Sequence, residues 1–277
     1  MNCAWKELLA ILPHWLRPEV DRLGKDSLQE IRLRVKRPVE LICSNARRTI
    51  PQRITEGDVQ TVINAASRYS PWMASTTARG YLTAPGGHRI GLCGEVTVQG
   101  GVMTGFREVT SLNIRVARDF PGICRELGNR KGSVLILGRP GAGKTTLLRD
   151  LIRARGEWET VSVVDERGEL FPSAGGFLTG THTDVITGCT KAQGIDAMLR
   201  TMGPDTIAVD EITAKEDCDA LIQAGWCGVQ LLATAHAANR EDLFHRPVYK
   251  PLLQSGLFDA LVVMRPDKSF DTERITL

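Results

Sequence analysis

Hydrophobic and polar residues follow two different patterns along this chain, and the change comes near residue 120. In the first part, the stretch Glu30-Ile-Arg-Leu-Arg-Val-Lys36 alternates apolar and charged side chains. A period of two is typical of strands that have one face in a core and the other in water. Apolar residues at helical spacing predict helices over 4–12, 18–23 and 55–67. The first part therefore predicts a small α+β domain.

Further strands in this part are predicted by short apolar runs and by turn residues such as Pro85-Gly-Gly87. The predicted strands cover residues 39–43, 47–50, 81–83, 88–93, 95–98 and 111–117. The segment Asp119-Phe-Pro-Gly122 interrupts the pattern. We expect it to mark a boundary between a first domain, residues 1–119, and a second domain, residues 120–277.

From residue 130 onward, fully apolar strands alternate with amphipathic helices. The expected strands are residues 134–137, 161–164, 206–209, 230–234 and 260–264, and the expected helices are residues 145–155, 192–202 and 215–224. Strand–helix alternation of this kind is the signature of a parallel sheet covered by helices. The second domain is therefore predicted to be α/β.

A glycine-rich loop lies between the first of these strands and the helix after it. It fits the pattern G-x-x-x-x-G-K-[ST]. The predicted nucleotide-binding residues are Gly138, Arg139, Pro140, Gly141, Ala142, Gly143, Lys144, Thr145 and Thr146. A phosphate chain must lie against consecutive backbone N–H groups, which bulky side chains would block. We expect Lys144 to reach the β- and γ-phosphates of ATP and the Thr145 hydroxyl to bind Mg²⁺.

Later strands also end in residues that are capable of chemistry. Asp165-Glu166 follows the second apolar run, Asp210-Glu211 the third, and His236 the fourth. Ligands of open α/β sheets bind beyond the carboxyl ends of the strands. We expect Asp210 to orient Mg²⁺, Glu211 or Glu166 to polarise the attacking water, and His236 either to sense the γ-phosphate or only to cap its strand. The group Asp165-Glu-Arg-Gly-Glu169 could also be a solvated turn with a local ion pair.

Arginines of the first domain are further candidates. Arg89, Arg107, Arg115 and also Arg200 in the second domain have no obvious acidic neighbour in the sequence. Phosphoryl transfer benefits from an arginine supplied by a neighbouring subunit. We predict that Arg89, and second Arg115, completes the site of another subunit, although most long arginines are simply solvated.

Composition restricts the class of protein. The chain has 277 residues, 42% hydrophobic and 24% charged, which is ordinary for a globular protein. Residues 1–119 carry a net charge of +6 and residues 120–277 a net charge of −3. Seven cysteines without a C-x-x-C pair argue against a zinc site or a disulfide framework. No apolar run approaches 18 residues and no signal peptide is evident, so we expect a cytoplasmic protein.

Taken together, the motifs resemble those of a known family. The order of P-loop, Asp165–Glu169, Met202–Ile212 and Thr234–Ala237 is similar to that of the secretion ATPases of type II and type IV systems. The stretches 86–91, 111–117 and 165–169, with Arg246-Pro and Phe258-Asp, resemble more closely the stage III sporulation protein AA family of endospore formers. Two departures from the secretion ATPases are Asp210, where many have glycine, and Thr213, where they have arginine.

The resemblance implies a RecA-like P-loop ATPase domain with a smaller N-terminal α+β domain that serves as a partner or ring interface. It implies a homohexamer in the mother-cell cytoplasm, bound peripherally to the membrane through embedded channel components that face the forespore. The main alternative is a nucleic-acid-dependent RecA-like motor that uses the basic first domain. Aromatic residues are only 5%, which leaves few stacking platforms, so nucleic acid is the less favoured partner. A scaffold that binds ATP but hardly hydrolyses it also remains open.

Overall fold

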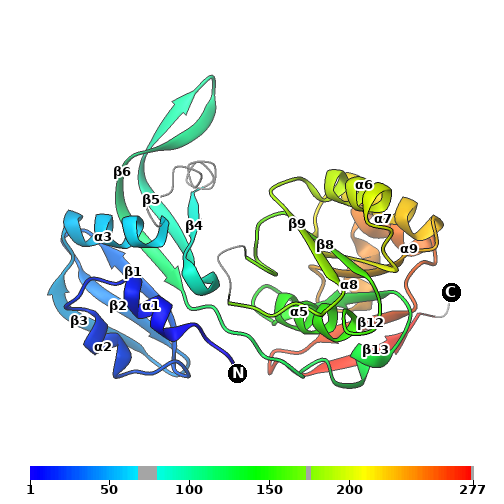
Figure 1. The fold of residues 1–277 in the computed structure, drawn as a ribbon, viewed down its shortest axis with the longest axis horizontal. Helices are drawn as coiled ribbons and strands as arrows, with labels where there is room; N and C mark the ends of the chain where they lie inside the picture. The colour runs from blue at the N-terminus through cyan, green and yellow to red at the C-terminus, as the bar shows by residue number, and fades with distance from the viewer. Residues whose placement is uncertain (68–79, 173–175, 276–277) are drawn as a thin grey trace. The chain divides into compact units, whose positions relative to one another are not determined.

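The computed structural model describes residues 1–67, 80–172 and 176–275. Contacts divide the chain into two compact units (Figure 1). The N-terminal unit holds residues 1–119 together with Pro172, Gly176 and Phe177, and the P-loop unit holds residues 120–171 and 178–277. Among the helices of the described segments, none has the length and apolar character needed to cross a membrane.

An antiparallel sheet forms the centre of the N-terminal unit, with strand order β3-β2-β1-β6-β5-β4. The strands are β1 (Leu28–Arg34), β2 (Pro38–Cys43), β3 (Arg47–Arg53), β4 (Tyr81–Thr83), β5 (Arg89–Gln99) and β6 (Val102–Arg115). The helices are α1 (Trp5–Ile11), α2 (Arg17–Asp21) and α3 (Glu56–Ser67), with the short 3₁₀ turn η2 (Pro85–Gly87). The predicted alternation is confirmed in β1, where Ile31 and Leu33 are buried in the core beneath the helices.

The longest hairpin of this unit differs from the prediction. The expected strands 88–93 and 95–98 are one continuous strand, β5, and the expected strand 111–117 is only the end of the long strand β6. Gly94 does not interrupt β5, although glycine often ends a strand. A Cβ atom there would lie 2.0 Å from the carbonyl oxygen of Glu108, at a position where the register shifts. Gly94 therefore allows the two strands to approach closely at a β-bulge and does not form a turn.

The P-loop unit contains a sheet with the order β13-β12-β7-β11-β10-β8-β9. Its strands are β7 (Val134–Leu137), β8 (Val161–Asp165), β9 (Thr183–Thr187), β10 (Thr206–Ile212), β11 (Gln230–Ala235), β12 (Ala260–Met264) and β13 (Phe270–Arg274). All neighbouring strands are parallel except the pair β12–β13. The central strands are buried on both faces, which explains their continuous apolar runs.

Helices cover both faces of this sheet. Helices α6 (Lys191–Thr201), α7 (Lys215–Trp226) and α9 (Lys250–Gln254) share one hydrophobic core with the sheet, and α5 (Lys144–Arg155) packs on the other face (Figure 1). The remaining elements are η3 (Arg125–Asn129), α8 (Arg240–His245) and η4 (Pro247–Tyr249).

Strands β9 and β13 were not predicted. They lie at the two edges of the sheet and consist mostly of polar residues. An edge strand is held by the hydrogen bonds of one neighbour and needs little apolar surface, so hydrophobic patterning does not reveal it.

Candidate active site

The glycine-rich loop connects β7 to α5, and its backbone explains its composition. A Cβ atom at Gly138 would lie 2.9 Å from the Cβ atom of Met264 on β12. Gly141 and Gly143 have φ angles of 78° and 100°, in the left-handed region that side chains disfavour. Only glycine fits these three positions without strain, and the loop remains free of side chains where a phosphate would approach.

Lys144 is held at the centre of this loop. Its ammonium group donates to the carbonyl oxygens of Gly138 at 2.9 Å and Arg139 at 3.3 Å, and to Nδ1 of His236 at 3.0 Å. The residue is buried. Burial lowers the pKa of Lys144, and the negative charges of Asp210 and Glu211 oppose that change.

His236 connects Lys144 to Glu211. Its Nε2 atom lies 3.0 Å from Oε1 of Glu211. An ammonium group can only donate, so Nδ1 of His236 must accept from Lys144 and Nε2 must carry the proton that it donates to Glu211. The geometry thus assigns one tautomer of the neutral imidazole and links three predicted site residues in a single chain of hydrogen bonds.

Asp210 lies at the end of β10 between two hydroxyl groups. Its carboxylate accepts from Thr145 Oγ1 at 2.7 Å and from Thr234 Oγ1 at 2.6 Å. The Thr234 hydroxyl also accepts from the backbone N–H of Glu211 at 2.8 Å. Glu211 itself has a φ of 53°, where the register of β10 and β11 shifts. This local bulge turns two consecutive carboxylates toward the same region instead of opposite faces of the sheet.

In the acidic stretch at the end of β8, Asp165 has a structural role and Glu166 is accessible. Asp165 is buried and accepts from the backbone N–H groups of Glu169 at 2.8 Å, Leu170 at 2.9 Å and Phe171 at 2.9 Å. Burial raises the pKa of Asp165 to about 6, although these hydrogen bonds act in the opposite direction. Asp165 therefore shapes the loop, and Glu166, which keeps about a third of its side chain exposed, is the more accessible of these two pocket carboxylates.

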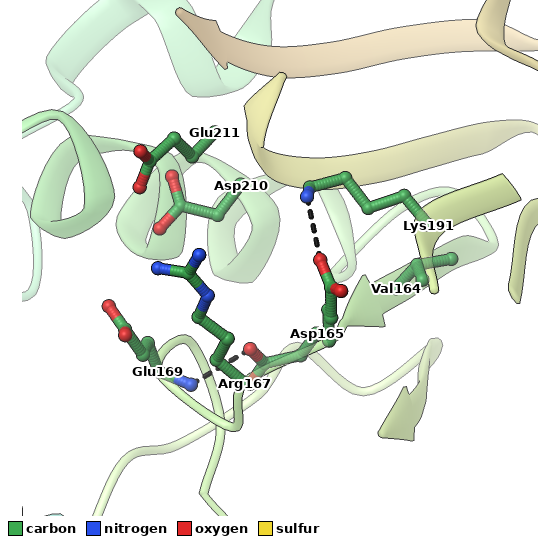
Figure 2. Close-up of a pocket in the computed structure, with 8 residues that line it drawn as sticks. Val164, Asp165, Arg167, Glu169, Lys191, Asp210 and Glu211 are labelled. Carbon is green, nitrogen blue, oxygen red and sulfur yellow. Dashed lines mark hydrogen bonds and ion pairs between the residues drawn. The ribbon is translucent and has the colours of Figure 1, made fainter. Parts of the chain in front are cut away.

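A pocket lies beyond the carboxyl ends of β8 and β10 (Figure 2). Side chains from both strand ends and from α6 surround it: Val164, Asp165, Glu166, Arg167, Glu169, Lys191, Asp210 and Glu211. Figure 2 shows the guanidinium group of Arg167 pointing toward the carboxylates of Asp210 and Glu211. The pocket thus combines carboxylates that can accept a proton with cations that can offset negative charge.

Comparison with known proteins identifies the family. The sequence pattern of sporulation stage III protein AA matches residues 6–274. The chain belongs to this family. It is 35% identical to stage III sporulation protein AA of Bacillus subtilis (strain 168) over 271 residues, which cover 91% of this chain and 88% of the relative. The resemblance inferred from the motifs is confirmed.

Solved structures show the same fold. The pilus retraction motor PilT with bound ADP matches 94% of this chain and 82% of its own, with a TM-score of 0.62 and 15% identity. The ATPase DotB of Legionella pneumophila matches 95% of this chain and 80% of its own, with a TM-score of 0.61 and 16% identity. The predicted fold class, a RecA-like P-loop domain with an N-terminal α+β domain, is confirmed for this family member.

The structure brings most of the predicted site residues of the family member together. Lys144, His236 and Glu211 form one chain of hydrogen bonds, and Thr145 binds Asp210. Glu166 shares the pocket with Asp210 and Glu211. The catalytic, nucleotide-binding and metal-binding roles of these residues stay predictions.

Arg107, Arg115 and Arg200, which have no obvious acidic neighbour in the sequence, each pair with a carboxylate in the structure. Arg115 lies 3.7 Å from Glu30, its partner across β1 and β6, and Arg107 lies 3.2 Å from Glu95 across β5 and β6. Arg200 pairs with Asp196 one helical turn earlier, at 2.9 Å. The first two pairs depend on strand register, which the sequence does not display. Arg89 stacks over the ring of Tyr81, 4.4 Å from its centroid.

Two polar residues of the site had no role assigned to them from the sequence, although Thr234 stands in the motif Thr234–Ala237. Lys191 pairs with Glu166 at 2.8 Å, and Thr234 bridges Asp210 and the backbone of Glu211. Thr234 could have been found as a polar residue near the end of an apolar strand. Lys191 leaves a weaker signal, a cation in the first turn of a helix, where acidic residues are preferred.

The residues present fit a magnesium ion. Asp210 and Thr145 offer a carboxylate and a hydroxyl 2.7 Å apart, both oxygen donors of the kind that Mg²⁺ prefers. Within the described segments, no three His, Cys, Asp or Glu residues are grouped as a complete metal site. Phosphate oxygens and water would have to supply the other ligands, as is usual where Mg²⁺ arrives with a nucleotide.

Proposed function

We propose that this protein is an ATP hydrolase that binds ATP with Mg²⁺ at the P-loop. The observation that carries the proposal is the network in which Lys144, His236 and Glu211 are joined beside the Thr145–Asp210 pair. The network joins three strand ends: Lys144 and Thr145 follow β7, Asp210 and Glu211 lie at the end of β10, and His236 follows β11. Family membership and the fold shared with ATPases support the same reading.

The phosphate chain would bind along the loop from Gly138 to Thr146, with the N-terminus of α5 favouring its negative charge. Lys144 would then exchange its contacts with backbone carbonyl groups for contacts with phosphate oxygens. Thr145 and Asp210 would hold Mg²⁺, which neutralises charge on the transferred phosphate. The exchange removes a hydrogen bond from His236, so His236 is placed to report the γ-phosphate to Glu211.

The general base would be Glu166 or Glu211. Both line the pocket, and both keep partial exposure, with about a third of each side chain accessible. Asp165 is a poor candidate because its oxygens are occupied by three backbone N–H groups. A base in the proposed position would orient and polarise the water that attacks the γ-phosphate.

At the cellular level, we propose that identical subunits form a ring, with six as the expected number, in the mother-cell cytoplasm. The ring would bind membrane-embedded channel components and energise or assemble a channel toward the forespore. Family membership is the support for this role. Molecular mass in solution, measured with and without ATP, tests the ring. Stimulation of turnover by a cytoplasmic fragment of a channel component, and not by single-stranded DNA, is the expected result for the partner.

The decisive experiment on the site uses Lys144→Ala. Removing the ammonium group leaves bound phosphates without their main countercharge, so binding of a fluorescent ATP analogue and phosphate release should both be lost. Lys215→Ala is the matched control, because Lys215 is also the first residue of a helix but is exposed. Hydrolysis by Lys144→Ala at the parent rate would mean that the site is assigned wrongly.

A further inference from the structure

Lys191 is a buried cation in the pocket that the proposed reaction does not yet use. Its ammonium group lies 2.8 Å from Oε2 of Glu166 and 3.6 Å from Oδ2 of Asp217, and only 7% of its side chain is exposed. Figure 2 shows the side chain extending from the start of α6 toward the acidic stretch after β8. A buried ammonium group is costly unless it is paired, and here both partners are carboxylates.

The position of Lys191 is unfavourable for the helix that carries it. It is the first residue of α6, where the partial positive charge of the helix disfavours a cation. The helix already has a complete cap, because Thr190 and Gln193 bond to each other's backbone N–H groups. Since α6 gains nothing electrostatically from Lys191, the reason for this cation must be sought in its two carboxylate partners, of which Glu166 is the nearer.

Backbone packing places this lysine over Glu166. A Cβ atom at Gly194, one turn into α6, would lie 2.4 Å from Cγ1 of Val164 at the end of β8. The missing side chain lets α6 begin directly against the strand that leads into Glu166. On the other side, Asp165 fixes the backbone of the same loop through three hydrogen bonds. Glu166 is thus held by its backbone through Asp165 and by its carboxylate through Lys191.

Asp217 connects the same lysine to the segment that follows Glu211. It accepts from the backbone N–H groups of Thr213 at 3.0 Å and Ala214 at 3.2 Å, at the start of α7. Lys191 therefore joins the two acidic strand ends of the pocket, one through Glu166 and the other through Asp217.

We infer that Lys191 is a positioning residue that holds the Glu166 carboxylate in the orientation needed to act on the attacking water. This inference rests on the proposed ATPase function. A glutamate side chain has three rotatable bonds, and Glu166 is partly exposed, so without Lys191 its carboxylate turns toward solvent. Misplacement of a catalytic group by about 1 Å costs on the order of 10²-fold in rate.

The test is a double-mutant cycle with Lys191→Met and Glu166→Gln in the full chain. Methionine keeps the length of the side chain and removes the charge. We expect Lys191→Met to lower kcat by roughly 10- to 100-fold. KM for ATP and the affinity for a fluorescent ADP analogue should stay within about twofold, because the phosphate loop is intact. In the Glu166→Gln background, Lys191→Met should cause no further loss, because the group that it positions is already removed.

Two controls and one replacement variant accompany the cycle. Lys191→Arg keeps the positive charge and should recover most of the rate, and Lys191→Gln replaces Lys191→Met if that variant does not fold. Lys215→Met changes the exposed lysine at the equivalent position of α7 and should leave kcat unchanged.

Additive losses in the cycle, a weaker ADP affinity in place of a lower kcat, or full activity of Glu166→Gln would each overturn the inference while the ATPase assignment stands. The parent protein and Lys144→Ala are measured beside the cycle. No hydrolysis by the parent, or equal hydrolysis by Lys144→Ala, would overturn the proposed function itself and the inference with it.

Discussion

The two units of this protein carry charged residues in opposite ways. In the N-terminal unit, arginines and glutamates pair along the surface of an antiparallel sheet, as Arg34 does with Glu40 and Arg107 with Glu95. In the P-loop unit, Lys144, Asp165 and Lys191 are buried, and all lie near the carboxyl ends of parallel strands. Parallel strands present the same end at one edge of a sheet, so side chains that follow them meet, whereas antiparallel strands send them alternately to opposite edges.

This difference in the burial of charged groups indicates which unit can hold catalytic groups. A pair such as Arg107–Glu95, with 75% and 56% of the side chains exposed, is weakened by water and salt. Burial makes the contacts of Lys144, Asp165 and Lys191 in the P-loop unit stronger, and it makes an unpaired charge there more costly. The chemistry is therefore expected in the P-loop unit, with the arginines of the N-terminal unit as the exception to be tested.

The largest expected effect concerns arginines of the N-terminal unit, because a catalytic role for them would mean that chemistry is not confined to the P-loop unit. If Arg89 and Arg115 complete the site of a neighbouring subunit, the double variant Arg89→Ala, Arg115→Ala should lose about 10³- to 10⁵-fold in hydrolysis. Mixing it with Lys144→Ala protein should restore activity, because some interfaces then pair an intact P-loop with intact arginines. Phosphate release on mixing is the measurement, with Arg107→Ala as the unaffected control. Full activity of the double variant alone would confine catalysis to the P-loop unit.

The next effect distinguishes two carboxylates within the P-loop unit. Glu166→Gln and Glu211→Gln should keep nucleotide affinity, and the variant that removes the true base should lose about 10²- to 10⁴-fold in kcat. Single-turnover phosphate release and binding of a fluorescent nucleotide separate the two quantities. Normal turnover of both variants would exclude both residues as the base.

A smaller effect contrasts the pH dependence of the two units. Burial raises the pKa of Asp165 to about 6, so the stability that it contributes is complete below its ordinary pKa and is lost as the pH rises through 6. Burial lowers the pKa of His88, which bonds to Ala4 O at 2.8 Å and accepts from Ala117 N at 3.1 Å. Its contribution is complete above pH 6.5, its ordinary value, and falls as the pH drops below it.

Lowering the pH from 7 to 5.5 should therefore weaken the N-terminal unit and strengthen the P-loop unit, each by about 1 kcal/mol or less. Amide hydrogen exchange followed separately in α1 and β8 measures this. Asp165→Asn and His88→Gln, which do not titrate, should flatten the pH dependence of their own unit only. Parallel behaviour of both units would contradict these two pKa directions.

The smallest effect is expected on the surface of the N-terminal unit. Arg107→Ala removes an exposed ion pair and should lower the free energy of unfolding by less than about 1 kcal/mol. The reference is Arg149→Ala, because buried Arg149 donates to the carbonyl oxygens of Leu170 at 2.7 Å and Glu169 at 2.8 Å. Its loss should be several times larger, since it leaves buried carbonyl groups unpaired. If urea unfolding shows the same loss of stability for Arg107→Ala and Arg149→Ala, burial does not make the contacts of the P-loop unit stronger than the exposed ion pairs.

Local chemistry made a large part of this protein predictable from its sequence. The loop from Gly138 to Thr145 needs glycines for its backbone and a lysine for its charge, so the motif can be recognised from the sequence alone. Buried parallel strands need apolar side chains on both faces, so β7 and β12 coincide with the predicted ranges. The Asp210-Glu211 pair could be located because ligands of such sheets bind at strand ends.

Only the tertiary structure decided which residues act together. Asp165 and Glu166 are neighbours in sequence and both line the pocket, yet Asp165 is buried against its own loop and a third of the Glu166 side chain is exposed. Lys191 meets Glu166 across 25 residues, and Lys144 meets His236 across 92. Such contacts arise where strand order and helix packing bring distant segments together. The interaction energy of such contacts depends on the distance between the groups and on their burial, and the sequence alone gives neither quantity.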